Sequence, residues 1–238
     1  MMTCDRIRDK INDDGSATMS FTAPESLTEK IANYLSTQIV EGKLKSGERI
    51  QEARVVNDLQ VSRGPVREAL LLLEARYLIT ILPRRGAFVT GLTPESVEDL
   101  YDTYVHLLAL LTRRVTQKWT DTTLAPLLKQ IETIKSLPDH QPQAFIDAGF
   151  TLMRMAYSLS GNIYLCDTLT KLQPALHRTY TVAMKHNAWE TQRGLIFFSG
   201  LLKAVMERKT EQLPKLIHDY GSYQCQLVIS ALEKQEQR

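Results

Sequence analysis

The spacing of apolar residues changes at Thr93, and this change constrains the fold more than any other feature of the sequence. After Thr93, apolar residues recur at helical spacing in long segments, and no alternating strand pattern interrupts them. We expect six helices, over residues 94–119, 122–137, 141–160, 163–185, 188–208 and 210–235. Long helices joined by short turns pack side by side, and the interior of such a bundle is a common place for a ligand pocket. The sequence therefore predicts an antiparallel all-helical bundle over residues 93–238.

The part of the chain before Thr93 has shorter elements in a different order. Residues 26–29, with the sequence SLTE, form a capping box that begins a first helix. A short second helix is expected over residues 51–59, and Ser62 is the expected N-cap of a third. The stretches "YLITIL" and "AFVT" then lie on either side of "PRRG", which indicates a hairpin. The sequence therefore predicts a mostly α protein whose residues 26–92 form a winged helix-turn-helix domain.

Composition and charge narrow the class of protein. The formal net charge is only +2, so a surface that binds a polyanion has to be a local patch. Cys4, Cys166 and Cys225 are scattered without metal-ligand spacing, which is typical of a reducing compartment and favours the cytoplasm. No apolar run approaches the roughly 20 residues that a membrane span needs. Residues 1–25 are polar and contain acidic residues, unlike a signal peptide, and we expect them to be a disordered tail.

The stretch "VSRGPVREALLLLEARYL", residues 61–78, combines charge and apolar residues on one expected helix. One face of this helix would anchor it in a core through Val66, Ala69, Leu70 and Leu73. Arg63 and Arg67 project beside that face from the first turns, where a recognition helix contacts bases or phosphates. Two arginines on an amphipathic helix are usually plain solvated charges, but a preceding helix pair and a following wing favour DNA binding. Leu71 and Leu72 lie outside the core stripe, and we expect one of them to pack against the wing, the second domain or a partner subunit.

The N-terminal domain resembles the GntR family of bacterial transcription regulators. The resemblance is carried by "VSRGPVREAL" and by further family positions at Gly42, Leu44, Gly47, Ile50, Glu52, Arg84 or Arg85, Gly86, Phe88 and Val89. It implies DNA contacts on the recognition helix and at the wing tip, by Ser62, Arg63, Gly64, Arg67, Arg84, Arg85 and Gly86. It also implies a homodimer that binds a near-palindromic operator in double-stranded DNA, because each protomer supplies one half-site reader.

Several positions depart from the family pattern. Gly64 stands where threonine is frequent, and Leu71 and Leu72 stand where basic residues are frequent. Gln60 and Tyr77 replace glycines that are usual at these turns, so both are expected to adopt left-handed backbone geometry at a cost of about 1 kcal/mol each. We therefore expect a standard fold with an altered operator preference.

The C-terminal domain resembles the FadR-type C-terminal domain, called FCD, in its six-helix, VanR-like form. The resemblance rests on "LTPESVEDLYDTY" and "DAGFTLMRMAYSLSGN" and on the helix lengths. Many such domains hold a divalent metal through an aspartate and three histidines. Here Asp147 matches the aspartate, whereas Thr151, Phe198 and Tyr220 stand at the histidine positions. Because imidazoles supply most of the affinity for a transition metal, we expect no bound metal and no cofactor.

The same resemblance indicates what the domain senses. The arginine that is usual in the first helix of the bundle is replaced by Tyr104, so the expected effector-binding set is Tyr104, Asp147, Thr151, Phe198 and Tyr220. These aromatic replacements favour a partly apolar effector, such as an acyl-CoA-like molecule or another partly apolar acid. Two alternatives stay open: a metal-dependent sensor of small carboxylates, and a helical interaction protein whose aromatic residues only fill a closed core.

Catalysis is not expected. The sequence has no Ser-His-Asp ordering, phosphate loop, metal-ligand spacing or paired-carboxylate motif, and its five histidines are dispersed. We therefore interpret the chain as a cytoplasmic DNA-binding transcription regulator, expected to be a repressor, whose operator binding responds to a small-molecule effector.

Overall fold

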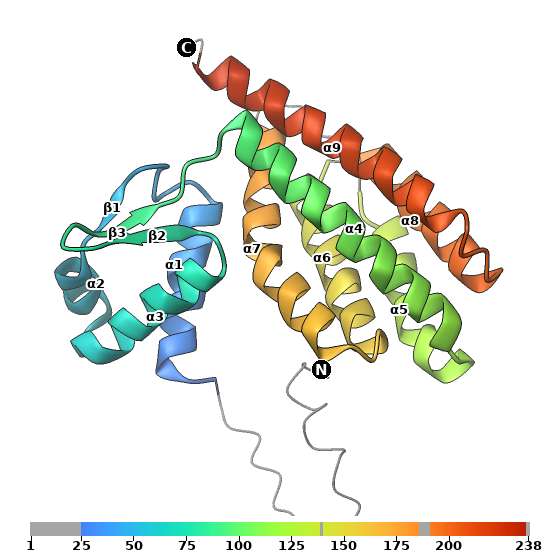
Figure 1. Ribbon diagram of the computed structural model, residues 1–238, viewed down its shortest axis with the longest axis horizontal. Helices are drawn as coiled ribbons and strands as arrows, with labels where there is room; N and C mark the ends of the chain where they lie inside the picture. Colours follow the sequence, from blue (N-terminus) through green and yellow to red (C-terminus); the bar gives the residue numbers. More distant parts are fainter. Residues whose placement is uncertain (1–24, 139, 186–190, 237–238) are drawn as a thin grey trace, which may run out of the picture. The chain divides into compact units, whose positions relative to one another are not determined.

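The computed structural model describes residues 25–138, 140–185 and 191–236 (Figure 1). The chain divides into two compact units, and the boundary between them falls between Gly91 and Leu92. We call them the winged unit and the helical unit and treat each by itself. The expected tail over residues 1–25 lies outside the described residues except for Glu25.

The winged unit consists of three short helices and a small sheet. In chain order its elements are α1 (Leu27–Val40), β1 (Arg49–Ile50), α2 (Glu52–Leu59), α3 (Arg63–Ala75), β2 (Ile79–Leu82) and β3 (Gly86–Val89). The strand order is β1-β3-β2, and both strand pairs are antiparallel. The three helices and the hairpin confirm the sequence prediction. β1 was missed because two residues are too few for an alternating pattern.

The local signals of the winged unit act as the sequence predicted. The Ser26 side chain accepts a hydrogen bond from the Glu29 amide while the Glu29 side chain accepts one from the Ser26 amide, which completes the capping box of α1. The four core positions predicted on α3 are all buried, and they belong to one cluster with residues from α1, α2 and the sheet. Gln60 and Tyr77 have φ angles of 52° and 60°, so both adopt the expected left-handed geometry.

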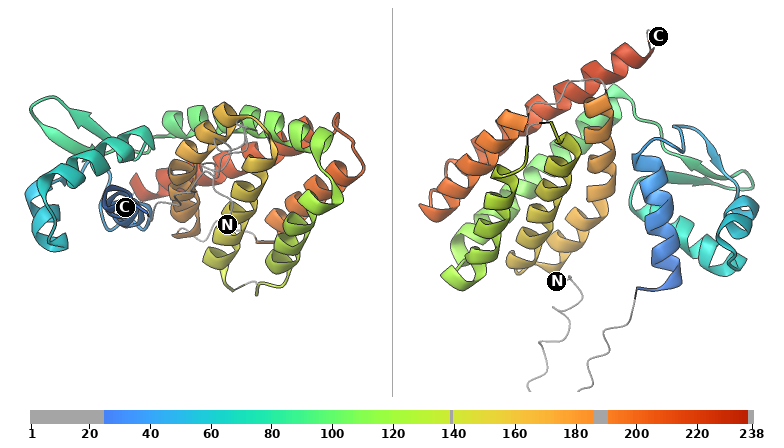
Figure 2. Two further views of the ribbon diagram at one scale, coloured as in Figure 1. Left: turned by 90° about the horizontal axis from the view of Figure 1, so that it is seen from below. Right: turned by 180° about the vertical axis from the view of Figure 1, so that it is seen from behind.

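The helical unit contains only helices among its described residues. They are α4 (Pro94–Lys118), α5 (Asp121–Lys135), α6 (Pro142–Leu159), α7 (Ile163–Lys185), α8 (Thr191–Met206) and α9 (Leu213–Glu236). Thr93 caps α4 and Pro94 occupies its first turn, as expected. Figure 2 shows α4 and α9 running antiparallel along each other, with α6 and α7 beside them. The predicted antiparallel bundle is confirmed.

Two glycines allow the helices of this unit to approach closely. A Cβ on Gly194 of α8 would lie 2.6 Å from the ring of Phe145 on α6, which is closer than atoms can pack. A Cβ on Gly221 of α9 would overlap the side chain of Val105 on α4. Both glycines therefore make room for neighbouring side chains in the core of the bundle.

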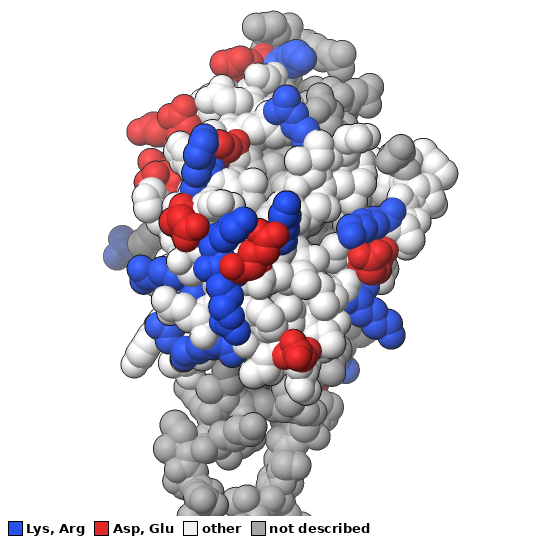
Figure 3. Space-filling view, turned by 90° about the vertical axis from the view of Figure 1, so that its right-hand side faces the viewer, with Lys and Arg blue, Asp and Glu red and all other residues white. Residues whose placement is uncertain are grey.

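The surface carries both signs of charge. On the face drawn in Figure 3, Lys and Arg lie close to Asp and Glu within a larger uncharged area, in agreement with the small net charge of +2. Within the described ranges, no helix is long and apolar enough to cross a membrane.

Candidate DNA interface and ligand pocket

The start of α3 exposes a row of polar and small residues. Ser62 is the N-cap with extended backbone, and its side chain makes no capping hydrogen bond. Ser62, Arg63, Gly64 and Arg67 are all exposed, and a Cβ placed on Gly64 would have no atom within 4 Å. The first amides of a helix carry partial positive charge and lack intrahelical partners. The exposed end of α3 is therefore suited to bind an anion.

Arg67 is held by a neighbouring helix. Its Nε donates to Oε2 of Glu52, at the start of α2, over 3.0 Å. Both side chains are substantially exposed, at 66% for Arg67 and 39% for Glu52. Ion pairs of this kind contribute little to stability, so the main effect of the pair is to orient the guanidinium group. The sequence showed both residues but gave no sign of their contact.

The tip of the wing gathers three arginines. Arg84, with φ of 62°, and Arg85 form the turn between β2 and β3. The Arg85 guanidinium carbon lies 5.7 Å from the centre of the Phe88 ring, within the range of a cation–π contact. Arg49 of β1 lies against Gly86, because a Cβ on Gly86 would be 3.3 Å from Arg49 Nε. Arg49 was missed from the sequence because a two-residue strand leaves no alternating pattern that would indicate its pairing with the wing.

The two leucines of α3 outside the core stripe have different surroundings. Leu72 is partly buried and packs against the core cluster of the winged unit. Leu71 is 58% exposed, and it follows Arg67 by one helical turn and Gly64 by two. Leu72 thus packs within its own unit, and packing of either leucine against the wing, the second domain or a partner subunit stays a prediction. Leu71 is an apolar residue on the exposed face.

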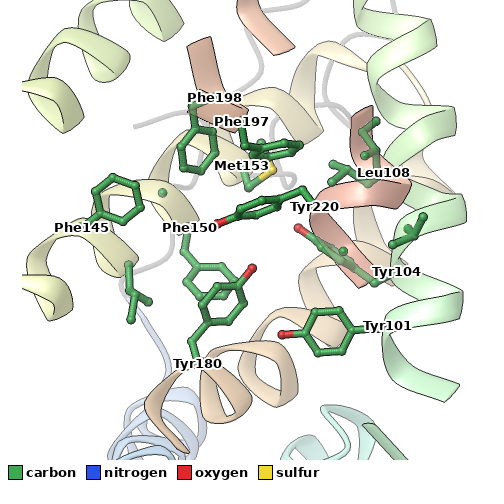
Figure 4. A pocket seen from close by; sticks show the side chains of 15 residues that line it. Tyr101, Tyr104, Leu108, Phe145, Phe150, Met153, Tyr180, Phe197, Phe198 and Tyr220 are labelled. Carbon is green, nitrogen blue, oxygen red and sulfur yellow. The ribbon is translucent and has the colours of Figure 1, made fainter. Parts of the chain in front are cut away.

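The helical unit encloses an apolar pocket (Figure 4). Its walls come from five helices and consist of Tyr101, Tyr104, Val105, Leu108, Phe145, Ile146, Gly149, Phe150, Met153, Tyr180, Phe197, Phe198, Ile217, Tyr220 and Gly221. The cavity volume is about 50 Å³, which is room for roughly three or four water molecules. No Asp, Glu, Lys, Arg or His is found among the described residues that line it.

Aromatic rings form much of the wall. Phe197 and Tyr220 are stacked, with ring centres 4.1 Å apart and planes at 7°. Phe150 meets Tyr180 edge to face at 5.4 Å. Such contacts are worth more than the apolar area they bury, so they help to fix the shape of the pocket.

The tyrosine hydroxyl groups of the pocket are uncharged. Burial raises the pKa of Tyr104 to about 12, with the neighbouring Tyr157 hydroxyl partly opposing this shift. Burial also raises the pKa of Tyr101, Tyr180 and Tyr220. At neutral pH these groups therefore remain neutral hydrogen-bonding partners.

The structure brings together only part of the effector-binding set expected from the sequence. Tyr104, Phe198 and Tyr220 line the pocket, but Asp147 and Thr151 do not. On α6 the lining residues are Ile146, Gly149, Phe150 and Met153, and at 100° per residue the other two positions lie on an adjoining face.

Asp147 instead lies in a polar group between α6 and α7, and Thr151 bonds to neighbours on α6 itself. Asp147 Oδ1 lies 3.2 Å from Nε2 of His177 and accepts a hydrogen bond from Gln143 Nε2 over 3.0 Å. Thr151 accepts a hydrogen bond from Arg154. Burial lowers the pKa of His177, while Asp147 opposes this shift. The structure therefore places Asp147 and Thr151 outside the pocket lining, because a motif alignment does not show which way a helix face turns, and their role in effector binding stays a prediction.

The residues present do not fit a transition-metal site. In the part of the chain that the structure describes, no three His, Cys, Asp or Glu side chains are grouped to hold a metal ion. The remaining positions of the family pattern offer a phenyl ring and a phenol inside the pocket, and a carboxylate outside it. Such a set lacks the imidazoles that bind zinc or similar metals.

An exposed helix start with a basic wing, joined in one chain to a helical unit with an apolar pocket, defines a DNA-binding regulator with a ligand-binding domain. Comparison with known families agrees with this class. The chain belongs to the GntR family: the family of bacterial regulatory proteins named gntR matches residues 27–89, and the FCD domain matches residues 99–218. The chain is a DNA-binding transcription regulator of this family with an FCD effector domain, and not an enzyme.

Similar proteins include regulators of bacterial operons. The chain is 31% identical over 198 residues to the gluconate operon transcriptional repressor of Bacillus licheniformis, a match that covers 79% of each protein. It is 36% identical over 100 residues to the HTH-type transcriptional regulator YdhC of Bacillus subtilis, but this match covers only 42% of the chain and 45% of YdhC.

Solved structures share the fold. McbR/YncC of E. coli superposes with a TM-score of 0.67 at 20% identity, covering 89% of this chain and 99% of that one. A GntR regulator of Rhodococcus sp. RHA1 gives 0.66 at 19% identity, with 86% and 98% covered. At these identities the likeness extends to the fold alone.

Proposed function

We propose that the chain acts in the cytoplasm as a homodimeric repressor that binds a near-palindromic operator through α3 and the wing. The observation that carries the DNA interface is the shared exposure of Arg63 and Arg67 on α3 together with the arginines of the wing tip. A two-fold dimer would place two such units on half-sites about 34–36 Å apart, one helical turn of DNA. The relatives named repressors support the sign of regulation.

The proposed DNA interface predicts a strong dependence of operator binding on salt. Removing one arginine that binds a phosphate should reduce the slope of log K against log [salt] by about 1. We would measure fluorescence anisotropy with the DNA upstream of the chain's own gene, for the unchanged chain, Arg63→Ala, Arg67→Ala and Arg49→Ala. Lys129→Ala, an exposed change on α5, is the matched control for the removal of one positive charge. Unchanged affinity and slope in all three arginine variants would refute the assignment of α3 and the wing.

We propose further that the pocket of the helical unit binds a partly apolar effector without a metal ion. The supporting observation is a cavity lined by aromatic side chains that include Phe198 and Tyr220, two residues that the family resemblance places where other members have metal ligands. A thermal-shift series with fatty acyl-CoAs, fatty acids and dicarboxylates, each with and without Zn²⁺, tests this proposal. Stabilisation only by a dicarboxylate together with Zn²⁺ would overturn it in favour of a metal-dependent carboxylate sensor.

The small cavity volume gives weight to a second candidate, in which the aromatic residues form a closed core without effector. In that case no compound of the series stabilises the chain, and operator binding is the same in its presence and absence.

A further inference from the structure

We propose that the ligand of this pocket is an uncharged, compact aromatic molecule that hydrogen-bonds to tyrosine hydroxyl groups through a hydroxyl or carbonyl of its own. The inference rests on the proposed function, namely that the pocket is the effector site, and it narrows the chemical class. It excludes effectors that carry a carboxylate.

The pocket offers no counter-ion to a charged ligand. None of the 15 lining residues, all within the described ranges, carries a formal charge. Asp147 of α6 and His177 of α7 pair with each other outside the pocket. Arg154, next to the lining Met153, donates a hydrogen bond to Thr151 and does not line the cavity. Arg178 precedes Tyr180 by two residues, which turns it to another face of α7, and it does not line the cavity. A carboxylate inside these walls would lose its hydration without gaining a charged partner, whereas a neutral ligand avoids that cost.

The hydroxyl groups of the pocket suit a neutral partner. In Figure 4 the hydroxyls of Tyr101 and Tyr104 on α4, Tyr180 on α7 and Tyr220 on α9 point toward the middle of the pocket. Tyr101 is already engaged, because its hydroxyl lies 3.0 Å from Thr179 Oγ1. Tyr104 and Tyr220 come from neighbouring helices and interact with Tyr157 and Gln224, and their neutral hydroxyls can both donate and accept, so each can serve a second partner. They suit a ligand hydroxyl or carbonyl better than an anion.

Two further buried polar groups lie beside the lining tyrosines. The Tyr157 hydroxyl and the Gln224 side chain are each 1% exposed, and they interact with Tyr104 and Tyr220, although neither the Tyr157 hydroxyl nor the Gln224 amide oxygen makes a well-aligned hydrogen bond within the described residues. Tyr157 lies beside Tyr104, and Gln224 follows Tyr220 by one helical turn. Buried polar atoms normally find a well-aligned partner, so a ligand hydroxyl or carbonyl that bonds to Tyr104 or Tyr220 would extend a neutral polar network that already reaches Tyr157 and Gln224.

The size and shape of the cavity limit the class of ligand further. A cavity of about 50 Å³ leaves no room for an extended ligand without movement of the walls. The walls themselves are flat rings, among them the Phe197–Tyr220 stack and the Phe150–Tyr180 edge contact. A single planar ring, which fills a cavity of about 150 Å³ in a protein core, also requires the walls to move, but less than an extended ligand does, and it can make offset or edge contacts with these faces.

The test compares three probes that share one ring. Benzyl alcohol is neutral and has a hydroxyl, toluene is neutral without a polar group, and benzoate is an anion. With the full-length chain in titration calorimetry, we expect benzyl alcohol to bind most tightly and benzoate at least tenfold more weakly. Tyr104→Phe and Tyr220→Phe keep both rings and should weaken benzyl alcohol by about fivefold each, leaving toluene unchanged.

Tyr164→Phe is the matched control, since Tyr164 is 83% exposed at the start of α7 and lies outside the pocket. It should change the affinity for none of the probes. Near-ultraviolet circular dichroism of all three variants verifies that their aromatic packing is intact before the affinities are compared.

The outcomes separate this inference from the proposed function. If benzoate, or a fatty acid of the thermal-shift series, binds as tightly as benzyl alcohol, the pocket is an effector site but the neutral class is wrong. If benzyl alcohol binds and both tyrosine variants leave its affinity unchanged, the assigned hydrogen bonds are wrong. If neither neutral probe binds while an acyl-CoA does, the ligand class is overturned, and if nothing binds at all, both proposals fail.

Discussion

The winged unit carries its candidate functional residues on its surface, whereas the helical unit carries them within its core. In the winged unit, Arg63 and Arg67 are exposed, and the buried residues of α3 only hold the helix in place. In the helical unit, Tyr104 and Phe198 are 7% and 8% exposed and belong to the core itself. The first unit can therefore change its binding residues at little cost to folding. In the second, the same side chains serve both the fold and the pocket.

The largest effect that tests this comparison is expected from Phe198→Ala. Removing a buried aromatic ring from the pocket wall should lower the free energy of unfolding of the helical unit by about 3–5 kcal/mol. Urea unfolding followed by circular dichroism measures it. Ile196→Ala on the same helix, at a residue that is 64% exposed, should change stability far less. A decrease below about 1 kcal/mol for Phe198→Ala would show that pocket and core are separable after all.

A smaller decrease is expected from Gly221→Ala. The added Cβ overlaps Val105, whose branched side chain has little freedom to move, so α4 and α9 must shift apart. We expect the free energy of unfolding to fall by about 1–3 kcal/mol, as for other overpacked cores. The neighbouring exposed change Ser222→Ala serves as control, and equal stability of the two variants would contradict the close approach of the helices.

In the winged unit, by contrast, a substitution that changes the freedom of the backbone should raise the stability of the folded chain. Tyr77 has φ of 60° and is 57% exposed, so Tyr77→Gly relieves left-handed strain while removing little buried area. The expected gain is about 1 kcal/mol in the free energy of unfolding, seen as a higher urea midpoint. Thr80→Gly, at an exposed residue of β2 that pairs with Phe88 in the sheet, should instead destabilise. Lower stability in both variants would rule out strain at Tyr77.

The smallest expected effect comes from Gly64→Ala, the same substitution as in Gly221→Ala but at an open position. Because no atom lies within 4 Å of the new Cβ, the helix should gain about 0.5 kcal/mol from the lower chain entropy of alanine. Operator affinity, measured by anisotropy, should fall at the same time if this face approaches DNA closely. A variant that is less stable than the unchanged chain would contradict the open environment of Gly64.

The sequence predicted the winged unit in more detail than the pocket for physical reasons. Helix caps, turn residues and left-handed positions such as Gln60 depend on neighbours in the chain, so they are visible in a single sequence. β1 and the contact of Arg49 with the wing depend on pairing between distant segments, which leaves almost no local pattern.

The pocket depends on how helices rotate against each other. Tyr104, Phe198 and Tyr220 were assigned to it through a family pattern, and Asp147 was assigned with them although it faces His177. One helical face cannot be placed against another from spacing alone when both faces carry polar and apolar residues. The aromatic lining from Phe150 and Tyr180 was missed for the same reason.

In the free protein, the carboxylate of Glu52 occupies the Arg67 guanidinium group and so competes with DNA for it. Any DNA group that takes up Arg67 Nε has to displace a carboxylate that already holds it at 3.0 Å. When Arg67 binds a phosphate outside the operator, it exchanges one anionic partner for another, and the net gain in binding free energy is small. In the proposed complex, a guanine edge that engages both arms of the guanidinium would repay the exchange. Because an exposed pair of this kind is worth no more than about 1 kcal/mol, it holds Arg67 in place before binding without blocking its release to the operator.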